Sequence, residues 1–355
     1  MMPGFSGRSG NPLPPTMKAL ELRSYEGWRS GLKLVQKPRP QPGPGQVLVK
    51  IAAAPVNPAD IAFMKGQYGV RKALPTVPGW EGSGTVVAAG SGLAARFFVG
   101  RRVACAALDG QDGTWAEYMV TSASRCMPLR QHITTEQGAM LLVNPLSAWA
   151  MIDLARRGRF PAVAQTAAAS ALGRMLLRLG RRFGLPMVHI VRRPEQVELL
   201  QALGAEYVLS THQADFDEQL REVCQRLRVT LALDAVAGEM TGRLLQAMPG
   251  QAQVIVYGTL SNSASQIQAG RLIFKKQQIS GFWLSQWLAQ AGWGKVLYAG
   301  WQVQSWLGDE LKTEVQARLP LAEARRGLDM YVGGMTRGKV LFVPESDCCT
   351  SSGQT

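Results

Sequence analysis

Apolar positions in residues 17–140 fall in short runs separated by Gly and Pro, a spacing typical of β-strands and turns. A first strand is expected at MKALEL, which begins at Met17. The clearest later runs are QVLVKIAAAPV (46–56), GSGTVVAAG (82–90), GRRVACAAL (100–108) and GTWAEYMVT (113–121). This part of the chain therefore predicts an all-β, barrel-like domain.

The pattern changes near Thr135, where TTEQGAMLLVNPLSAWAMIDLA reads as helical and Thr134 or Thr135 can cap the helix. Strands and helices alternate after this point. The expected strands are AVAQTAA (162–168), PMVHIV (186–191), EYVLS (206–210), VTLALDAV (229–236) and QVIVYG (253–258). The expected helices cover 171–184, 194–204, about 215–226 and 239–247. Such alternation predicts an α/β fold with a doubly wound parallel sheet.

The end of the chain departs from this alternation. The stretch from Trp283 to Trp306 is rich in tryptophan but interrupted by Gln and Lys, which predicts an amphipathic helical stretch and no membrane span. GKVLFVP (338–344) is an isolated strand that we expect to rejoin the first domain. The predicted division is a disordered lead-in (1–16), a catalytic domain (17–140), a nucleotide-binding domain (141–285), a helical stretch returning to the catalytic domain (286–344) and a disordered tail (345–355).

Charge and cysteine content narrow the function classes. The net charge of +14 comes from scattered basic pairs such as Arg101-Arg102 and Arg156-Arg157, and no nucleic-acid motif accompanies them. We therefore expect phosphate-bearing small molecules as ligands and no nucleic acid or membrane. The five cysteines have neither disulfide-framework nor zinc-ligand spacing, which favours a reducing, cytoplasmic compartment.

A possible phosphate-binding turn follows the strand at 162–168. It reads Ala-Ala-Ala-Ser-Ala-Leu-Gly from Ala167 to Gly173. Dinucleotide sites usually carry three glycines here, and only the last one is present, since Ala167 and Ser170 hold the other positions. Two interpretations stay open: an Ala-rich turn without a ligand, or a turn whose small residues admit a pyrophosphate and whose Ser170 hydroxyl adds a contact.

Arg192 and Arg193 end the next predicted strand, about 20 residues after the turn, where NAD sites usually carry an acid. Two guanidinium groups can pair with the 2′-phosphate of NADPH. The alternative is a pair of solvated surface arginines. The position at the strand end predicts NADPH rather than NADH.

Several motifs resemble the zinc-free medium-chain dehydrogenases/reductases, in the branch of quinone oxidoreductases and mitochondrial-type trans-2-enoyl thioester reductases. The resemblance covers about 17–343 and implies a GroES-like β-barrel catalytic domain with an inserted Rossmann domain. The motifs that carry it are NPADIAFMKGQYG (57–69), VNP (143–145), DAVAGEMTGRLL (234–245), VIVYG (254–258) and IFKKQQISGFWLSQW (273–287).

The resemblance implies roles for individual residues. Tyr68 matches the proton donor of enoyl thioester reductases, Asn57 and Trp283 are expected in the substrate pocket, and Asn144 on the nicotinamide side. Trp283 is alternatively a core aromatic. The residues expected to contact NADPH are Asn144, Ala169, Ser170, Ala171, Leu172, Gly173, Arg192, Arg193, Tyr257, Gly258, Thr259, Leu260, Phe282, Trp283, Leu284, Ser285 and Lys339. A homodimer through strands at 253–257 and 279–283 is also implied.

The residues themselves argue against a catalytic zinc. A metal would need a thiolate near Asn57 and a histidine at Trp80, and neither residue is a zinc ligand. The three histidines are far apart in the chain, and His189 is expected in the core because it lies within a predicted strand. Glu81 then has no metal to serve, and we expect it to brace its turn through hydrogen bonds.

Three functions follow from these features. The first is reduction of a trans-2-enoyl thioester on CoA or acyl carrier protein, with hydride from NADPH to C3 and a proton from Tyr68 to C2, since a phenol is ordinarily protonated at neutral pH. The thioester carbonyl takes up the charge, so no metal is required. The second is a quinone or alkenal reductase, in which Tyr68 is a surface turn residue. The third is an NADPH-binding structural or nucleic-acid-binding partner with little turnover.

Overall fold

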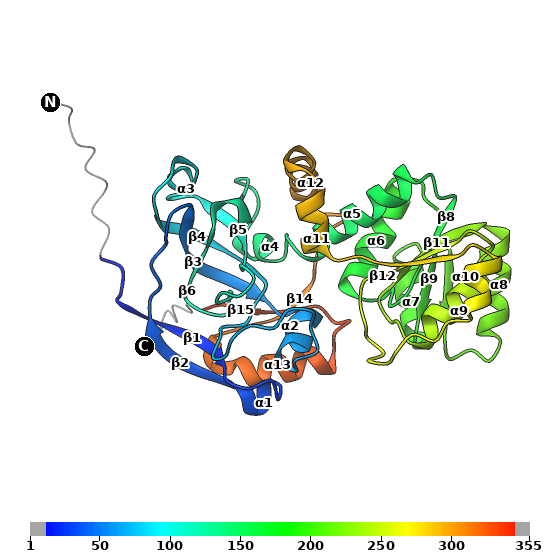
Figure 1. Ribbon diagram of the computed structural model, residues 1–355, viewed down its shortest axis with the longest axis horizontal. Coiled ribbons are helices and arrows are strands. Elements are labelled where there is room, and N and C mark those ends of the chain that lie inside the picture. The colour runs from blue at the N-terminus through cyan, green and yellow to red at the C-terminus, as the bar shows by residue number, and fades with distance from the viewer. Residues whose placement is uncertain (1–11, 345–355) are drawn as a thin grey trace, which may run out of the picture. The chain divides into compact units, whose positions relative to one another are not determined.

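The computed structural model describes residues 12–344, and the chain divides into two units (Figure 1). The first runs to Pro128 and includes Arg318–Leu328 and the end of the chain from Leu341. The second consists of Leu129–Ala317 and Asp329–Val340. The predicted tail and all but the last five residues of the predicted lead-in lie outside the described residues. No helix within 12–344 is long and apolar enough to cross a membrane.

The first unit is organised around β3 (Gln46–Pro55), a ten-residue strand with apolar side chains on both faces. The sheet has the order β14-β15-β3-β4-β5-β7, and β6 also pairs with β3. The other strands are β4 (Glu81–Ala89), β5 (Arg102–Ala106), β6 (Tyr118–Ser122), β7 (Cys126–Pro128), β14 (Val315–Leu319) and β15 (Lys339–Phe342). Trp115 fills the core: its ring meets Phe342 edge to face at 5.0 Å, and its indole donates to the Pro55 carbonyl. The last strand, β15, thus packs in this core.

Short elements surround the sheet. β1 (Thr16–Leu22) and β2 (Leu32–Pro38) form a separate antiparallel pair. The helices are α1 (Trp28–Gly31), α2 (Pro58–Met64), α3 (Leu93–Phe97) and α13 (Ala324–Gly333), the last of which continues into the second unit. The sequence pattern did not reveal β2, β7 or β14 because each alternates with polar residues or is only a few residues long.

The second unit contains a six-stranded parallel sheet with the order β10-β9-β8-β11-β12-β13. Its strands are β8 (Ala162–Gln165), β9 (Met187–Val191), β10 (Tyr207–Ser210), β11 (Val229–Asp234), β12 (Gln253–Val256) and β13 (Gln278–Gly281). The order reverses between β8 and β11, which is the switch point where doubly wound sheets bind ligands. The expected doubly wound sheet is confirmed, and its edge strand β13 lies where the resemblance implied a strand at 279–283.

Helices cover both faces of this sheet (Figure 1). α8 (Phe216–Arg226) and α9 (Glu239–Ala247) bury Phe216, Leu220 and Leu244 against one face. α6 (Ala171–Arg182) and α7 (Pro194–Ala202) bury Leu177 and Leu200 on the other. Alternate residues of β9 serve the two cores, as the two-residue period of a strand requires.

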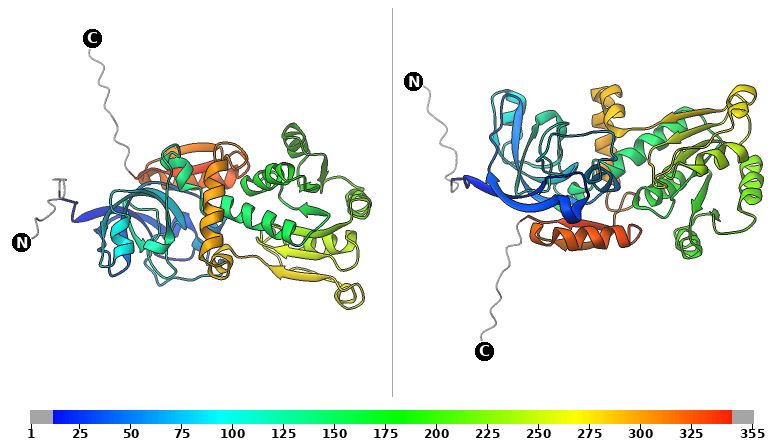
Figure 2. Two further views of the ribbon diagram at one scale, coloured as in Figure 1. Left: turned by 90° about the horizontal axis from the view of Figure 1, so that it is seen from above. Right: turned by 60° about the horizontal axis from the view of Figure 1, so that its bottom comes forward.

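Two predicted helical stretches are each broken in the structure. The stretch from Thr135 gives α4 (Thr135–Ala139), capped by the Thr134 hydroxyl, and then α5 (Asn144–Arg157). The tryptophan-rich stretch gives α11 (Leu284–Gln290) and α12 (Trp293–Trp306), because Gly292 between them has φ +75°. α12 packs against α5 (Figure 2). A last short helix is α10 (Ala269–Phe274).

Candidate active site

Asn57 and Glu81 form a buried polar pair in the first unit. Asn57 caps α2, with its backbone N–H donating to the Asp60 carboxylate at 2.8 Å. Its side-chain amide donates to Glu81 Oε1 at 3.0 Å. Glu81 therefore joins the start of β4 to the start of α2, the bracing role expected from the sequence. Asn57 is 1% exposed, and its assignment to the substrate pocket stays a prediction.

Tyr68 lies in the loop after α2 and is half-buried. Its ring contacts Trp80 with centroids 5.1 Å apart and planes tilted by 41°. Trp80 meets Phe63 edge to face at 5.3 Å on another side. Gly79 places this indole: it has φ +99°, and a Cβ there would lie 2.4 Å from the Thr114 hydroxyl oxygen. The residue in the histidine position of zinc dehydrogenases thus serves as a packing surface for Tyr68.

The residues near this pair do not form a metal centre. Within 12–344, no cluster of three or more His, Cys, Asp or Glu side chains could hold a metal ion. His189, far along the chain in β9, is 3% exposed, and burial lowers its pKa to about 4. It is the core histidine expected from the sequence.

In the second unit, the geometry of the turn after β8 explains why position 173 is a glycine. A Cβ at Gly173 would lie 2.4 Å from the Ala168 carbonyl oxygen, so only glycine fits there. Ala167 has φ +49°, a left-handed conformation that glycine adopts more easily than alanine. Ser170 is the N-cap of α6, and its hydroxyl accepts from the Gly173 N–H at 3.1 Å. The turn keeps dinucleotide-site geometry with one strained alanine, and the first N–H groups of α6 lack intrahelical acceptors.

Gln165 and His189 support this turn from below. The Gln165 amide nitrogen donates to the Gly173 carbonyl at 2.9 Å and lies 2.7 Å from His189 Nδ1. Because the amide nitrogen is a donor, His189 Nδ1 must accept, which requires the neutral imidazole. The lowered pKa of His189 is consistent with that requirement.

A buried carboxylate, Asp234, ties the switch point together. It ends β11, is fully buried, and accepts from the Thr166 hydroxyl at 2.8 Å and from the Thr241 hydroxyl at 2.8 Å. The backbone N–H groups of Val236 and Ala237 donate to the same carboxylate. Asp234 thus links the end of β8 to the loop after β11. Sequence reasoning assigned Asp234 no role, although an acid ending an otherwise apolar strand was the available signal.

Arg192 and Arg193 follow β9 at the carboxyl edge of the sheet, and both side chains are exposed. Their backbone N–H groups donate to the Gln196 side-chain oxygen, which fixes the start of α7. Neither guanidinium has an acidic partner among the described residues. Two uncompensated cations at this position fit the 2′-phosphate of NADPH.

The segments after β12 and β13 lie at the same edge. Gly258 lies close to the loop after β11, since a Cβ there would lie 2.8 Å from the Ala235 carbonyl oxygen. Burial raises the pKa of Tyr257, and the nearby Asp234 carboxylate adds to the effect. Parallel strands bring their carboxyl ends together, so the edge gathers the turn at 167–173, Arg192, Arg193, Tyr257–Leu260 and Phe282–Ser285.

Two predicted residues, Asn144 and Lys339, do not follow strands of this sheet. Asn144 is the first residue of α5, and Lys339 is a buried residue at the start of β15 whose ammonium lies 5.6 Å from the Tyr331 ring centroid. Trp283, which precedes α11, is 44% exposed. That exposure does not fit the alternative of Trp283 as a core aromatic.

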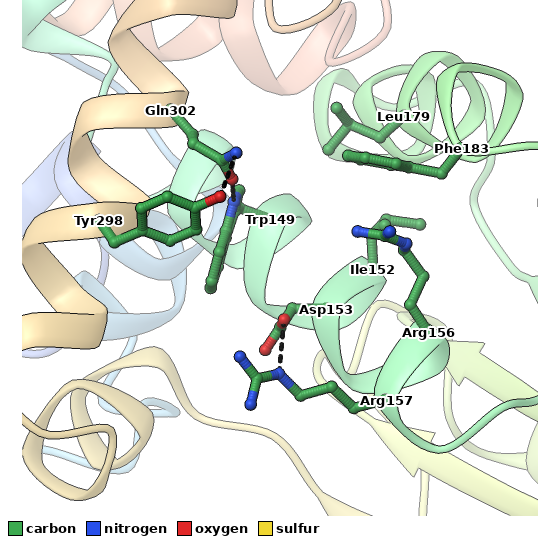
Figure 3. Close-up of a pocket in the computed structure, with 9 residues that line it drawn as sticks. All are labelled: Trp149, Ile152, Asp153, Arg156, Arg157, Leu179, Phe183, Tyr298 and Gln302. Atoms are coloured by element: carbon green, nitrogen blue, oxygen red, sulfur yellow. Dashed lines mark hydrogen bonds and ion pairs between the residues drawn. The ribbon is translucent and has the colours of Figure 1, made fainter.

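A cavity of about 370 Å³ lies among α5, α6 and α12, away from the predicted site residues (Figure 3). Its lining includes Trp149, Asp153, Arg156, Phe183 and Tyr298. Arg156 stacks over Phe183 at 4.1 Å. Burial alone would raise the pKa of Asp153, but hydrogen bonds from Lys295 and Arg157 outweigh it and the pKa is lowered. Because Asp153 is satisfied by these two cations, this polar cluster stabilises helix packing.

Two family models match the chain. The alcohol dehydrogenase GroES-like domain matches residues 43–131, and the zinc-binding dehydrogenase family matches residues 171–298. These ranges lie largely in the first and second units respectively. The second match covers most of the parallel sheet of the second unit. Although its name refers to zinc, no cluster of metal-ligating side chains occurs within 12–344.

Known proteins of two activities are similar to the whole chain. The mitochondrial enoyl-(acyl-carrier-protein) reductase of Rattus norvegicus is 31% identical over 287 residues, 79% of this chain and 72% of that protein. A structure of a candidate NADPH:quinone reductase from Mesorhizobium loti is 37% identical, with a TM-score of 0.88, covering 94% of this chain and 100% of the other. The quinone oxidoreductase of Thermus thermophilus, also solved with NADPH, is 26% identical, with a TM-score of 0.72, covering 92% and 100%.

Proposed function

This chain belongs to the medium-chain dehydrogenase/reductase superfamily, in the branch of enoyl and quinone reductases, and we propose that it reduces trans-2-enoyl thioesters with NADPH. It is an oxidoreductase of that superfamily, which uses NAD(P)H. The observation that carries the finer proposal is the packing of Tyr68 against Trp80 at the position where zinc dehydrogenases hold a metal ligand.

The second unit fits NADPH at the carboxyl edge of its sheet. Gly173 and Gly258 let their segments pack closely against the backbone at Ala168 and Ala235, which brings the turn, the start of α6 and the segment after β12 together at this edge. The N-terminus of α6 would hold the pyrophosphate, and Arg192 and Arg193 would pair with the 2′-phosphate. The cofactor, when bound, supplies the hydride. Asn144, Tyr257–Leu260, Phe282–Ser285 and Lys339 are proposed to line it.

The first unit supplies the proton. Reduction of an enoyl thioester at C3 leaves negative charge on the thioester, and C2 must then be protonated. Tyr68 is the proposed donor, because a half-buried phenol held against an indole has a fixed orientation. Asn57 and Trp283 are proposed for the substrate pocket. The acyl group is carried on CoA or on acyl carrier protein, whose negative charges suit a chain with a net charge of +14.

A quinone or alkenal reductase is the second candidate function. It is favoured by the 37% identity to the candidate NADPH:quinone reductase, which is higher than the 31% identity to the rat enoyl reductase. A reduced quinone takes protons from water, so this activity does not need Tyr68 as a donor. The two candidates therefore differ in their dependence on a single hydroxyl.

The test measures NADPH oxidation by absorbance, with crotonyl-CoA and an ortho-quinone assayed side by side on one preparation. Faster turnover of crotonyl-CoA, lost in Tyr68→Phe, is the expected result. Turnover of the quinone alone, equal in the wild type and Tyr68→Phe, would replace the enoyl proposal by the quinone one. Negligible turnover of both, with intact NADPH binding, would favour the third interpretation, a binding protein.

Two further features are proposed for the enzyme. β13 is the outer strand of the parallel sheet, which supports a homodimer formed through this edge. Cys105, Cys126 and Cys224, the cysteines within the described residues, are free thiols, and a reducing compartment such as the cytoplasm accommodates them. Sedimentation of the purified protein tests the first proposal.

A further inference from the structure

Lys72 is a buried lysine four residues after Tyr68. It is 5% exposed, and its ammonium donates to the Gln111 carbonyl at 2.5 Å. The ammonium also lies 4.7 Å from the centroid of the Trp80 ring and 5.7 Å from that of Phe63. A cation on an aromatic face gains more when it is shielded from water, so both contacts are favourable here.

Acidic groups surround Lys72, but its hydrogen bond goes to a backbone carbonyl. Asp112 accepts from Lys37 at 2.6 Å and from the Val77 N–H at 2.8 Å. Burial lowers the pKa of Lys72, while Asp112, Asp60 and Asp109 oppose that shift. Because Gln111 takes only one ammonium hydrogen, two remain for the aromatic rings.

Tyr25 fixes the loop that carries both Tyr68 and Lys72. Its hydroxyl donates to the Lys72 carbonyl at 2.7 Å and accepts from the Lys72 N–H at 2.9 Å. The Arg71 guanidinium lies over its ring at 5.0 Å. At the other end of the loop, Gly66 has φ +67°, and a Cβ there would lie 3.2 Å from Tyr25 Cβ. Two hydrogen bonds therefore hold the Lys72 end of the segment 66–72 on Tyr25, and the Gly66 end lies close to the same side chain.

Trp80 lies in contact with both Lys72 and Tyr68. It contacts the ammonium and the Tyr68 ring. Its indole N–H is buried and has no hydrogen-bond acceptor within residues 12–344. An indole with an unsatisfied N–H gains a hydrogen bond if it turns toward water, so something must hold it in place. The groups in contact with the indole are the Lys72 ammonium, the Phe63 ring and the Tyr68 ring, and only the ammonium is charged.

We propose that Lys72 is a positioning residue for Tyr68: its ammonium holds the Trp80 indole, and the indole holds the Tyr68 ring in its orientation. This inference rests on the proposed function for its kinetic consequence, but the restraint on Trp80 exists whatever the substrate. Lys72 does not touch substrate in this scheme. It acts only through the tryptophan that replaces the zinc ligand of related dehydrogenases.

The first experiment is independent of activity. Proton–nitrogen NMR spectra resolve the indole N–H signals, and Trp80→Phe identifies the signal of Trp80. In Lys72→Met, which keeps the length of the side chain without its charge, we expect the Trp80 signal to shift and its proton to exchange faster with water. Lys72→Arg should restore slow exchange. Lys65→Met is the matched control, because Lys65 makes a similar contact 5.7 Å from the centroid of a different indole, Trp28.

An unchanged Trp80 signal in a folded Lys72→Met protein would overturn the inference. If Lys72→Met does not fold, Trp80→Leu tests the same series of contacts, since it keeps Lys72 and removes the ring that packs against Tyr68. An enoyl turnover equal to that of the wild type in Trp80→Leu would likewise contradict the positioning role.

Kinetics then separate the inference from the proposed function. Lys72→Met should lower kcat for crotonyl-CoA by about tenfold to a hundredfold, the size of effect that a small misplacement produces, with the KM for NADPH unchanged. In a Tyr68→Phe background the same substitution should have no further effect. An equal loss in both backgrounds would refute the inference alone, whereas an unchanged rate in Tyr68→Phe would refute the proton-donor role.

Discussion

The turn at 167–173 and the loop at 66–72 achieve fixed geometry by different means. The turn depends on backbone conformation and on two hydrogen bonds: the Gln165 amide donates to the Gly173 carbonyl, and the Thr166 hydroxyl, just before the turn, donates to the Asp234 carboxylate. The loop depends on contacts with distant segments: the Tyr25 hydroxyl, the Trp80 ring and the Gln111 backbone carbonyl. A backbone turn tolerates alanine in place of glycine at a modest cost, whereas a loop held by side chains changes when one contact is lost.

The largest expected effect lies in the loop. Tyr68→Phe should lower kcat for crotonyl-CoA by about 10²- to 10⁴-fold, the range for loss of a general acid, while NADPH affinity stays the same. Steady-state kinetics and a fluorescence titration with NADPH measure the two quantities. If Tyr68→Phe weakened NADPH binding as much as it slowed turnover, the loop and the turn would not have the separate roles proposed for them.

The next effect concerns pH and the support of the turn. The pKa of His189 is about 4 in the folded chain and its ordinary value is 6.5, so the unfolded state binds the proton first as pH falls. The contribution of His189 to the free energy of unfolding is therefore complete above pH 6.5. It is lost as the pH falls from that value to about 4, by roughly 3 kcal/mol in total. Urea unfolding at several pH values measures it.

Two variants decide whether His189 is the source. His189→Gln should flatten the acid side of the stability profile, and His212→Gln, at an exposed histidine, should leave it unchanged. A profile that His189→Gln does not alter would assign the acid sensitivity to other groups.

A smaller effect is expected for the arginine pair. Arg192→Gln or Arg193→Gln should each weaken NADPH binding by about tenfold to a hundredfold, because a charge-assisted hydrogen bond contributes about 1.5–3 kcal/mol. NADH binding should change little, since NADH lacks the 2′-phosphate. Titrations with both cofactors measure the ratio of the NADPH and NADH affinities. An equal loss of NADH affinity would mean that these residues are solvated surface arginines.

The smallest effect is a gain. Ala167→Gly should stabilise the second unit by about 1 kcal/mol, because Ala167 has φ +49° and glycine adopts that conformation without strain. Gly173→Ala is the opposite case, since its Cβ would lie 2.4 Å from a backbone oxygen, and it should cost about 1–3 kcal/mol. The thermal unfolding temperatures of the two variants should shift in opposite directions from that of the wild type. If Ala167→Gly destabilised the unit as much as Gly173→Ala, packing of the Ala167 methyl group would outweigh the backbone strain at that position.

The sequence alone was sufficient to predict those features that depend on local or periodic interactions. The alternation of apolar runs predicted the parallel sheet, and the switch from short β runs to that alternation separated the two folding patterns. The prediction of zinc-free chemistry rests on residue type alone, since Asn57 and Trp80 stand where zinc dehydrogenases carry metal ligands. The sequence also offered Thr134 or Thr135 as an N-cap, and the Thr134 hydroxyl accepts from the Gln137 N–H only three residues on, a separation that a local pattern can reveal.

Tertiary structure alone decided the contacts that join remote segments. Tyr25 and Lys72 are 47 residues apart, Lys72 and Gln111 are 39 apart, and Thr166 and Asp234 are 68 apart. Which of these side chains meet depends on strand register, and β3 shifts register against β4 at two places. A shift of one residue moves every side chain to the other face of the strand, so no local pattern could identify the partners of Lys72 or Asp234.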